Sequence, residues 1–339
     1  MSVAVIILLV GLTSLVLTRW LARTDAAICI LDQPNERSLH SVPMPRTGGI
    51  AICAALFLGW LLHLLFSPAQ IPVQIFMGTV LVFCVSILDD RYGLPHYLRL
   101  IIQFGAALIL IRSGFVIDGD IIPGIALSPG PVLTLLTVMM SLWLINLYNF
   151  MDGMDGFAGG MTVIGFGVLA ILGWQQGDAL FSGAAMAVCA ASAGFLWFNF
   201  PPARIFMGDS GSTTLGFLVA AFAIWASRRG IAWVWVTLVV FSPFVVDATM
   251  TLLRRAVRGE RIWLAHRSHY YQRLVQLGWG HRRTVLAEYV VMLICAVAAL
   301  AINGESERMQ QLVLLALAVG YLCIAVAIHI MEIRRNASI

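Results

Sequence analysis

The chain contains no lysine, and only 11% of its residues are charged. A soluble globular domain carries roughly 25% charged residues, whereas 60% of this chain is hydrophobic. All 21 basic residues are arginines, and the net charge is only +4. This composition argues against a soluble domain and against a nucleic-acid partner, which needs a strongly basic surface. The sequence therefore predicts an integral membrane protein.

Paired cysteines are also lacking. The six cysteines are scattered, mostly within apolar segments, and none belongs to a Cys-x-x-Cys motif. This pattern argues against a zinc site and against a disulfide framework. We interpret the cysteines as small packing residues.

Long apolar segments define the expected fold. Eleven of them approach the ~20 residues that cross a bilayer. They cover residues 3–22, 47–66, 71–88, 98–116, 132–149, 158–174, 180–198, 212–227, 232–252, 285–303 and 311–331. We expect an all-α polytopic membrane protein with about eleven transmembrane helices, forming one domain over residues 1–339. The first segment lacks a basic n-region and an A-x-A site, so we expect a retained helix rather than a cleaved signal peptide.

The distribution of arginine predicts the orientation. Alternating helices place loops at about 23–46, 89–97, 150–157, 199–211 and 253–284 on one side, together with the C-terminal tail. That side receives seventeen arginines, and the opposite side receives four, including the dissenting pair Arg228-Arg229. Cytoplasmic loops of membrane proteins carry an excess of positively charged residues. We therefore expect the N-terminus outside and the C-terminus in the cytoplasm. All loops with unusual polar chemistry fall on this cytoplasmic side, which predicts an active site on that face.

The most informative segment runs from Trp143 to Gly160 and carries Asn149, Asp152 and Asp155. A carboxylate at a membrane helix end is costly unless it is paired or bound to a metal. Three-residue spacing on a helix end points these side chains roughly one way, as the oxygen ligands of a hard cation must. A turn rich in Asp and Gly explains the segment equally well when it is taken alone. The other polar loops decide between the two interpretations.

Two further acidic motifs lie at helix ends. Asp89-Asp90 ends the third apolar segment, and adjacent carboxylates there suit a general base or a metal-bound anion. Gly208-Asp209-Ser210-Gly211 leads into the eighth segment. Backbone N–H groups at a helix start favour phosphate, and Asp209 can hold the cation that accompanies it.

Two cytoplasmic loops are rich in basic residues. In the first loop, Arg37, His40 and Arg46 supply donors for an anion. The last loop contains a stretch able to form a short amphipathic helix on the membrane surface. Most of its arginines are expected to face lipid, whereas Arg267 and His269 are expected to reach a diphosphate.

Five motifs in this order resemble those of the polyprenyl-phosphate N-acetylhexosamine-1-phosphate transferases. They are Asp32-x-Pro-Asn-x-Arg37-x-x-His40-x-x-Pro-x-Pro-Arg46, Asp89-Asp90, Asn149-x-x-Asp152-Gly-x-Asp155-Gly, Phe206-Met-Gly-Asp209-Ser-Gly-Ser and the loop around His269. The resemblance covers nearly the whole chain. It implies transfer of a sugar-1-phosphate from a UDP-N-acetylhexosamine to undecaprenyl phosphate in the bacterial inner membrane, with release of UMP.

The resemblance also implies roles for individual residues. Asp209 and Asn149 match metal ligands for Mg²⁺, with Mn²⁺ as a substitute. The implied catalytic residues are Asp89, Asp90, Asp152 and His269. The resemblance also matches Arg99 and Asp155 to substrate-binding positions. The other expected substrate-binding residues are Arg37, His40, Arg46, Asn199 and Arg267, and the sequence itself adds Asp247 and Gln103 as candidates of lower weight. The expected partners are a UDP-N-acetyl sugar, undecaprenyl phosphate and the lipid bilayer, with a homodimer as an option.

The last loop departs from part of the family. It reads His269-Tyr-Tyr-Gln272, where one branch of the family carries a triple-His motif and others carry a His-x-His-His form. This form resembles the branch that starts O-antigen lipopolysaccharide synthesis, whose sugars include N-acetylglucosamine and 6-deoxy amino sugars such as N-acetylfucosamine. The sugar is therefore left open by the sequence.

Two other functions fit the composition less well. A transporter or flippase would place acids near mid-helix and functional groups on both faces, whereas the acids here lie at helix ends on one face. A CDP-alcohol phosphatidyltransferase would need a longer acidic motif than Asp152-Gly-Met-Asp155.

Overall fold

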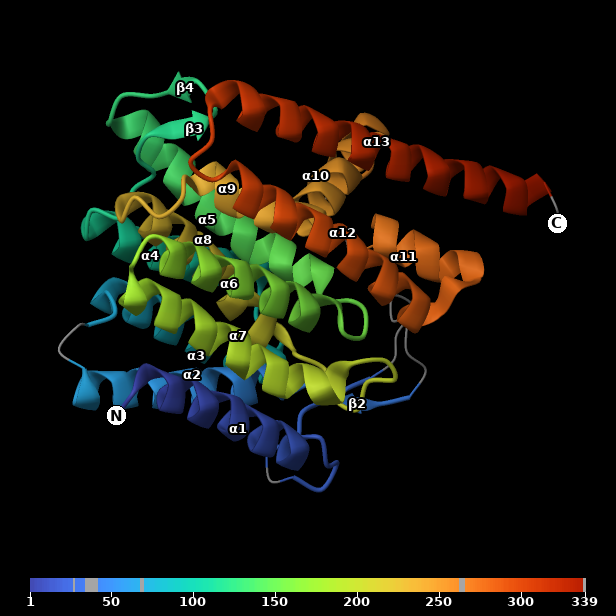
Figure 1. The fold of residues 1–339 in the computed structure, drawn as a ribbon. Helices are drawn as coiled ribbons and strands as arrows, with labels where there is room; N and C mark the ends of the chain where they lie inside the picture. The colour runs from blue at the N-terminus through green and yellow to red at the C-terminus, as the bar shows by residue number, and fades with distance from the viewer. Residues whose placement is uncertain (27, 34–41, 68–69, 262–265, 338–339) are drawn as a thin grey trace.

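The protein is mostly helical in a computed structural model, which describes residues 1–26, 28–33, 42–67, 70–261 and 266–337 (Figure 1). The helices are α1 Val3–Leu21, α2 Gly48–Phe66, α3 Val73–Tyr92, α4 His96–Arg112, α5 Pro131–Met151, α6 Phe157–Gln175, α7 Ala179–Asn199, α8 Asp209–Arg228, α9 Val234–Val240, α10 Ser242–Val257, α11 Tyr270–Leu274, α12 Gly280–Ile302 and α13 Glu307–Ala337. A π-helical turn at Val275–Trp279 joins α11 to α12. Two short antiparallel hairpins pair β1 Leu31–Asp32 with β2 Met44–Pro45 and β3 Asp120–Ile122 with β4 Ile125–Ala126.

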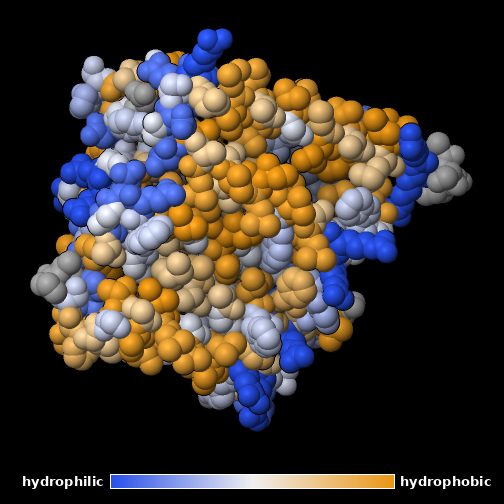
Figure 2. Space-filling view, viewed as in Figure 1, coloured by the Kyte–Doolittle hydropathy of each residue, from blue (hydrophilic) through white to orange (hydrophobic). Residues whose placement is uncertain are grey.

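Among the described residues, nine helices are long and apolar enough to cross a membrane, or ten if α9 and α10 count as one bent span. Each of the eleven predicted segments forms a helix, but two are not simple spans. Helix α4 has only 17 residues, and α9 meets α10 at 84°. Figure 2 shows a broad apolar belt between hydrophilic residues at two ends. These features make the chain a multi-pass membrane protein.

The bend between α9 and α10 has a local cause. Pro243 lies in the first turn of α10 and has no N–H to continue the hydrogen bonds of α9. The hydroxyl of Ser242 donates to the carbonyl of Val239 at 2.7 Å, which satisfies one group freed by the break. Helix α10 is therefore directed away from the axis of α9.

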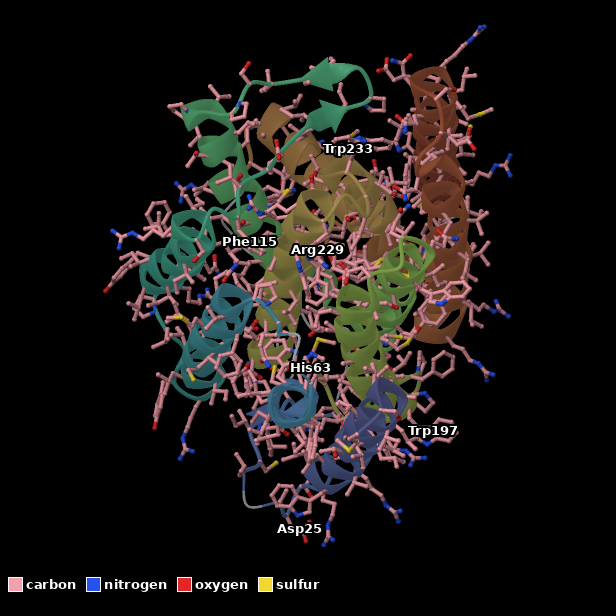
Figure 3. The ribbon with its side chains drawn as sticks, turned by 60° about the vertical axis from the view of Figure 1, so that its left-hand side comes forward. Asp25, His63, Phe115, Trp197, Arg229 and Trp233 are labelled. Carbon is pink, nitrogen blue, oxygen red and sulfur yellow. The ribbon has the colours of Figure 1, made fainter. Side chains whose placement is uncertain are left out.

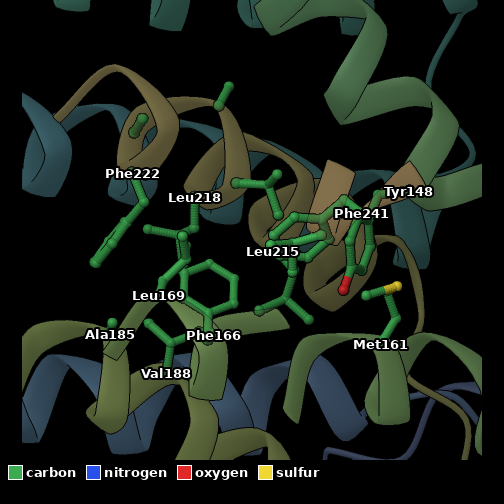
Figure 4. Close-up of a cluster of buried hydrophobic side chains, with 14 of the residues drawn as sticks. Tyr148, Met161, Phe166, Leu169, Ala185, Val188, Leu215, Leu218, Phe222 and Phe241 are labelled. Carbon is green, nitrogen blue, oxygen red and sulfur yellow. The ribbon is translucent and has the colours of Figure 1, made fainter. Parts of the chain in front are cut away.

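Helix α8 is the central element, and nearly all of its residues are buried. Its aromatic and leucine side chains pack with Phe166, Leu169 and Phe241 in the cluster of Figure 4. Gly216 allows α8 to contact α5 closely, because a Cβ atom there would lie 2.6 Å from the carbonyl oxygen of Leu144. This contact fixes the start of α8 relative to the end of α5, and both ends carry site residues.

The chain termini lie at opposite ends of the bundle (Figure 1). Arg229, labelled in Figure 3, lies at the end that carries the N-terminus and forms a 2.6 Å ion pair with Asp178. The neighbouring Arg228 lies 5.4 Å from the ring centroid of Phe115 and donates to the carbonyl of Gly114. The arginine pair that departs from the charge pattern is therefore held by local partners.

Candidate active site

Backbone hydrogen bonds join β2 and the first turn of α2 to the segment before α8. Phe206 N donates to the carbonyl of Pro45, and Gly49 N donates to the carbonyl of Met207, each at 2.7 Å. Gly49 must lack a side chain, because a Cβ atom would lie 2.1 Å from the backbone nitrogen of Gly211. Two loops that are far apart in the sequence thus form one rigid platform.

Asp90 caps the N-terminus of α8. Its Oδ1 accepts from the backbone nitrogen of Asp209 at 3.0 Å, and its Oδ2 accepts from that of Ser210 at 2.9 Å. Arg46 donates to the backbone carbonyl of Asp90, and its Nε lies 3.6 Å from Asp90 Oδ1. The positive end of the α8 dipole favours this carboxylate. This geometry gives Asp90 a capping contact, and its catalytic role stays a prediction.

Asp89 faces a different neighbour, because successive helical side chains point about 100° apart. Its Oδ1 accepts from Leu94 N at 2.7 Å, and its Oδ2 accepts from Arg99 Nη1 at 2.9 Å. The same Arg99 nitrogen lies 3.4 Å from Asp209 Oδ2. The Arg99 guanidinium therefore forms ion pairs with both Asp89 and Asp209, although the two carboxylates belong to different helices.

Asn149 completes this cluster from the end of α5. Its Nδ2 donates to Asp209 Oδ1 at 2.9 Å and to the hydroxyl of Ser212 at 3.0 Å. The described residues contain no group of three His, Cys, Asp or Glu side chains that could enclose a metal ion. Mg²⁺ needs no such cage, since it is commonly held by one or two carboxylates together with water and substrate phosphates. The oxygens of Asp209, Asp89 and Asn149 fit that ligand set.

Asp152 and Asp155 do not point the same way. Asp152 is partly buried, and burial together with the charges of Asp209 and Asp90 raises its pKa well above the usual value for Asp. Asp155 Oδ1 lies 3.0 Å from His281 Nδ1, and its Oδ2 accepts from Ala203 N at 3.0 Å. The electrostatics thus couple Asp152 to the acidic cluster, whereas Asp155 contacts the start of α12 and the loop before α8.

Asn199 holds two loops together. Its Oδ1 accepts from Gly156 N and its Nδ2 donates to the carbonyl of Ile205, each at 2.9 Å. The residue is only 4% exposed. Both ends of the amide form hydrogen bonds within the fold, and the substrate contact of Asn199 stays a prediction.

His269 precedes α11 and is buried against α10. Its Nδ1 lies 3.2 Å from Asp247 Oδ1. The ring stacks with Phe150 and lies 4.8 Å from the ring of His266, measured between centroids. Burial lowers the pKa of His266 to about 4, and the neighbouring His269 and Arg255 act in the same direction.

A cavity of about 620 Å³ connects these groups. This is within the range of ligand pockets, roughly 300–1,000 Å³. Its lining includes Asp89, Arg99, Gln103, Asn149, Phe150 and His269. The cavity therefore brings together side chains from α3, α4 and α5 with the loop before α11.

Two of the predicted basic residues, Arg37 and His40, lie outside the described residues. Arg267 is described, but its side chain does not appear in the lining of the cavity, and its backbone carbonyl accepts from Gln276 at 2.8 Å.

Several lining residues were missed as site residues by the sequence. Asn146 donates to Gln103 Oε1 at 2.7 Å, and both side chains line the cavity. His96 contacts Arg99 through Nδ1, and Gln272 accepts from His269 N at 3.3 Å. The sequence feature that could have identified Asn146 is a polar amide side chain within a long apolar segment.

Comparison with known proteins gives the family. Residues 72–227 match glycosyl transferase family 4. A probable undecaprenyl-phosphate N-acetylglucosaminyl 1-phosphate transferase of Bacillus subtilis is 29% identical over 299 residues, covering 87% of this chain and 83% of the relative.

Two other relatives cover most of the chain. A decaprenyl-phosphate N-acetylglucosaminephosphotransferase of Mycobacterium tuberculosis is 30% identical over 337 residues, covering 86% of this chain and 81% of the relative. A phospho-N-acetylmuramoyl-pentapeptide-transferase of Shouchella clausii is 30% identical over 280 residues, covering 76% and 83%. The chain belongs to glycosyl transferase family 4, the family of polyprenyl-phosphate N-acetylhexosamine-1-phosphate transferases.

Proposed function

We propose that this protein transfers a sugar-1-phosphate from a UDP-N-acetylhexosamine to undecaprenyl phosphate. A phosphate oxygen of the lipid forms a bond to the phosphorus that bears the sugar. The bond from that phosphorus to the bridging oxygen of the diphosphate breaks, and UMP leaves with the electron pair. The products are a lipid diphosphate sugar and UMP.

One observation carries this proposal: Asp89, Arg99, Asn149 and Asp209 converge from four helices, and the first three of them line one cavity. Anionic and cationic groups together suit a reaction between two phosphates. Two such charges at 4 Å repel by ~4 kcal/mol at an effective dielectric constant of 20. The relatives named above are transferases that act on polyprenyl phosphates, which supports the same reaction here.

The residues take distinct roles in this proposal. Mg²⁺, held by Asp209 with Asn149 and Asp89, would neutralise phosphate charge and orient the diphosphate. Arg99 supplies a second positive charge beside the same carboxylates. His269 and Asn149 both border the cavity, and the His269 ring stacks with Phe150, the residue that follows Asn149. A phosphate can be positioned there.

The arginine distribution supports a placement of this cavity on the cytoplasmic side of a bacterial inner membrane. The His269-Tyr-Tyr-Gln272 form supports a donor that is UDP-N-acetylglucosamine or a 6-deoxy amino sugar, in O-antigen or related envelope synthesis. A transporter is disfavoured, because the acidic cluster lies at helix ends and the relatives are transferases.

The test is release of UMP by purified protein given undecaprenyl phosphate and a panel of UDP-N-acetyl sugars, with and without Mg²⁺. We expect release that requires lipid, Mg²⁺ and one preferred sugar. Asp209→Asn should abolish release, whereas Asp178→Asn, at the other end of the bundle, should retain it. Absence of release from every donor by folded wild-type protein would reject the proposal.

A further inference from the structure

Asp247 holds the start of α11 on α10. Its Oδ1 accepts from Tyr270 N at 2.9 Å, and its Oδ2 accepts from Tyr271 N at 3.1 Å. Thr251, one turn along α10, adds a third hydrogen bond at 3.1 Å. The residue is only 7% exposed. A buried carboxylate with three donors is strongly fixed in place.

The same carboxylate determines the orientation of His269. Every other contact of Asp247 Oδ1 comes from a donor, and a carboxylate can only accept, so the 3.2 Å contact requires a hydrogen on His269 Nδ1. In the neutral ring this leaves Nε2 with a free lone pair. Nε2 makes no hydrogen bond within the described part of the chain, and the ring lines the 620 Å³ cavity.

Two more contacts fix α11 on its other sides. The hydroxyl of Tyr271 donates to the carbonyl of Phe150 at 3.2 Å, next to Asn149 on α5. Arg273 forms two hydrogen bonds of 2.6 Å with Glu332 on α13. Helix α11 is therefore held by three helices, and Asp247 also forms the hydrogen bond with the His269 ring.

We propose that Asp247 is a positioning residue, which orients the His269 imidazole so that Nε2 faces the substrate cavity. This inference rests on the proposed transferase function. Partners that fix the tautomer and orientation of metal-binding histidines contribute roughly 10–100-fold to metal affinity or activity, and we expect an effect of the same order for the His269 ring. Asp247 acts through His269 and does not itself line this cavity.

A double-mutant cycle tests the inference. Asp247→Asn keeps the size and one acceptor oxygen but removes the carboxylate. We expect kcat for UMP release to fall roughly 10–100-fold, while KM for the UDP-sugar changes little. In a His269→Ala background, Asp247→Asn should cause no further loss, because the ring that it orients is gone. An equal loss in both backgrounds would overturn the inference and assign Asp247 a purely structural role.

Amide hydrogen exchange separates this inference from the proposed function. Without substrate, Asp247→Ala should speed exchange at Tyr270 and Tyr271 relative to wild type. Asp178→Ala, which removes a helix cap at the other end of the bundle, should leave these amides unchanged. Unchanged exchange in Asp247→Ala would reject the positioning contact. Faster exchange together with no UMP release by wild-type protein would reject the proposed function alone.

Discussion

Asp90 Oδ1 accepts a 3.0 Å hydrogen bond from the backbone N–H of Asp209, 119 residues further along the chain. This bond connects the last turn of α3 to the first residue of α8. The side chain of Asp90 is only 2% exposed, whereas that of Asp209 is 29% exposed. Asp90 thus fixes the backbone from which Asp209 reaches Arg99 and Asn149, and the two acids make different contacts.

The first prediction concerns this cap. Asp90→Ala removes two hydrogen bonds from the start of α8 and removes one of the two carboxylates near Arg46, leaving Asp32 at 3.8 Å. We expect a loss of roughly 1–3 kcal/mol in the free energy of unfolding. UMP release should also be lost, because the cap positions Asp209. Thermal unfolding of purified protein and the UMP assay measure the two effects.

Asp178→Ala is the matched control for Asp90→Ala. Asp178 accepts from Phe181 N at 3.0 Å and caps α7, with Arg229 as its ion-pair partner. The Asp178→Ala substitution should lower the melting temperature about as much as Asp90→Ala does, but the variant should retain UMP release. Full activity in Asp90→Ala would show that the cap does not position Asp209.

The second prediction concerns Arg99. Its guanidinium contacts Asp89 at 2.9 Å and Asp209 at 3.4 Å, so it competes with a cation for the same carboxylates. Arg99→Ala should lower the Mg²⁺ concentration that gives half-maximal activity, because two negative charges are left uncompensated. The maximal rate should nevertheless fall roughly 10–100-fold, since the second positive charge is lost.

A second measurement of Mg²⁺ binding does not depend on activity. The rise in melting temperature with Mg²⁺ reports binding to the folded protein and should begin at lower concentration in Arg99→Ala. Arg112→Ala, at the other end of α4, should match wild type. An increased Mg²⁺ requirement in Arg99→Ala would contradict competition between guanidinium and metal.

Apolar segments and helix-end acids allowed much of this molecule to be predicted. Each of the eleven apolar segments located by hydropathy is helical in the structure, although nine or ten spans, not eleven, are long and apolar enough to cross a membrane among the described residues. The acidic motifs with Asp89, Asn149 and Asp209 were correctly grouped, because alternation of helices places their loops at one end. The bend between α9 and α10 was missed, because hydropathy alone does not report a break at Pro243.

The sequence did not predict that the acidic residues of the site have different contacts. Adjacent Asp89 and Asp90 look equivalent, yet one contacts Arg99 and the other caps α8. The three-residue spacing of Asn149, Asp152 and Asp155 suggested one face, but α5 ends at Met151 and Asp155 lies beyond it, beside His281. Tertiary contacts between distant segments decided these roles.

The third prediction concerns pH. The pKa of His266 falls from 6.5 to about 4 in the folded protein, chiefly through burial. Between these values the unfolded chain binds more protons than the folded chain. The stability contribution is therefore complete above pH 6.5 and is lost as the pH falls towards 4. His266→Gln should reduce the pH dependence of the melting temperature in this interval.

His329→Gln is the control for His266→Gln, because the side chain of His329 is 64% exposed and is not subject to the same burial. Melting temperatures measured from pH 4 to pH 7 compare the three proteins. An unchanged pH dependence in His266→Gln would show that the neutral His266 ring does not contribute to stability.

The fourth prediction concerns Glu288, in the membrane-spanning part of α12. Within the described residues its carboxyl makes no hydrogen bond or ion pair, and it lines a cavity of about 290 Å³ that Asp247 also lines. An unpartnered acid in an apolar setting costs roughly 1–3 kcal/mol. Glu288→Leu should therefore raise the free energy of unfolding by about that amount.

The measurement is thermal unfolding in detergent and in lipid nanodiscs, beside Glu305→Gln. Glu305 is exposed after the end of α12, so its substitution should change stability by less than about 0.5 kcal/mol. A lower melting temperature for Glu288→Leu in nanodiscs, but not in detergent, would contradict the prediction. It would mean that a bilayer component forms the hydrogen bond or ion pair with Glu288 that the described residues do not form. A carboxyl group stabilises a membrane helix only when it has such a partner.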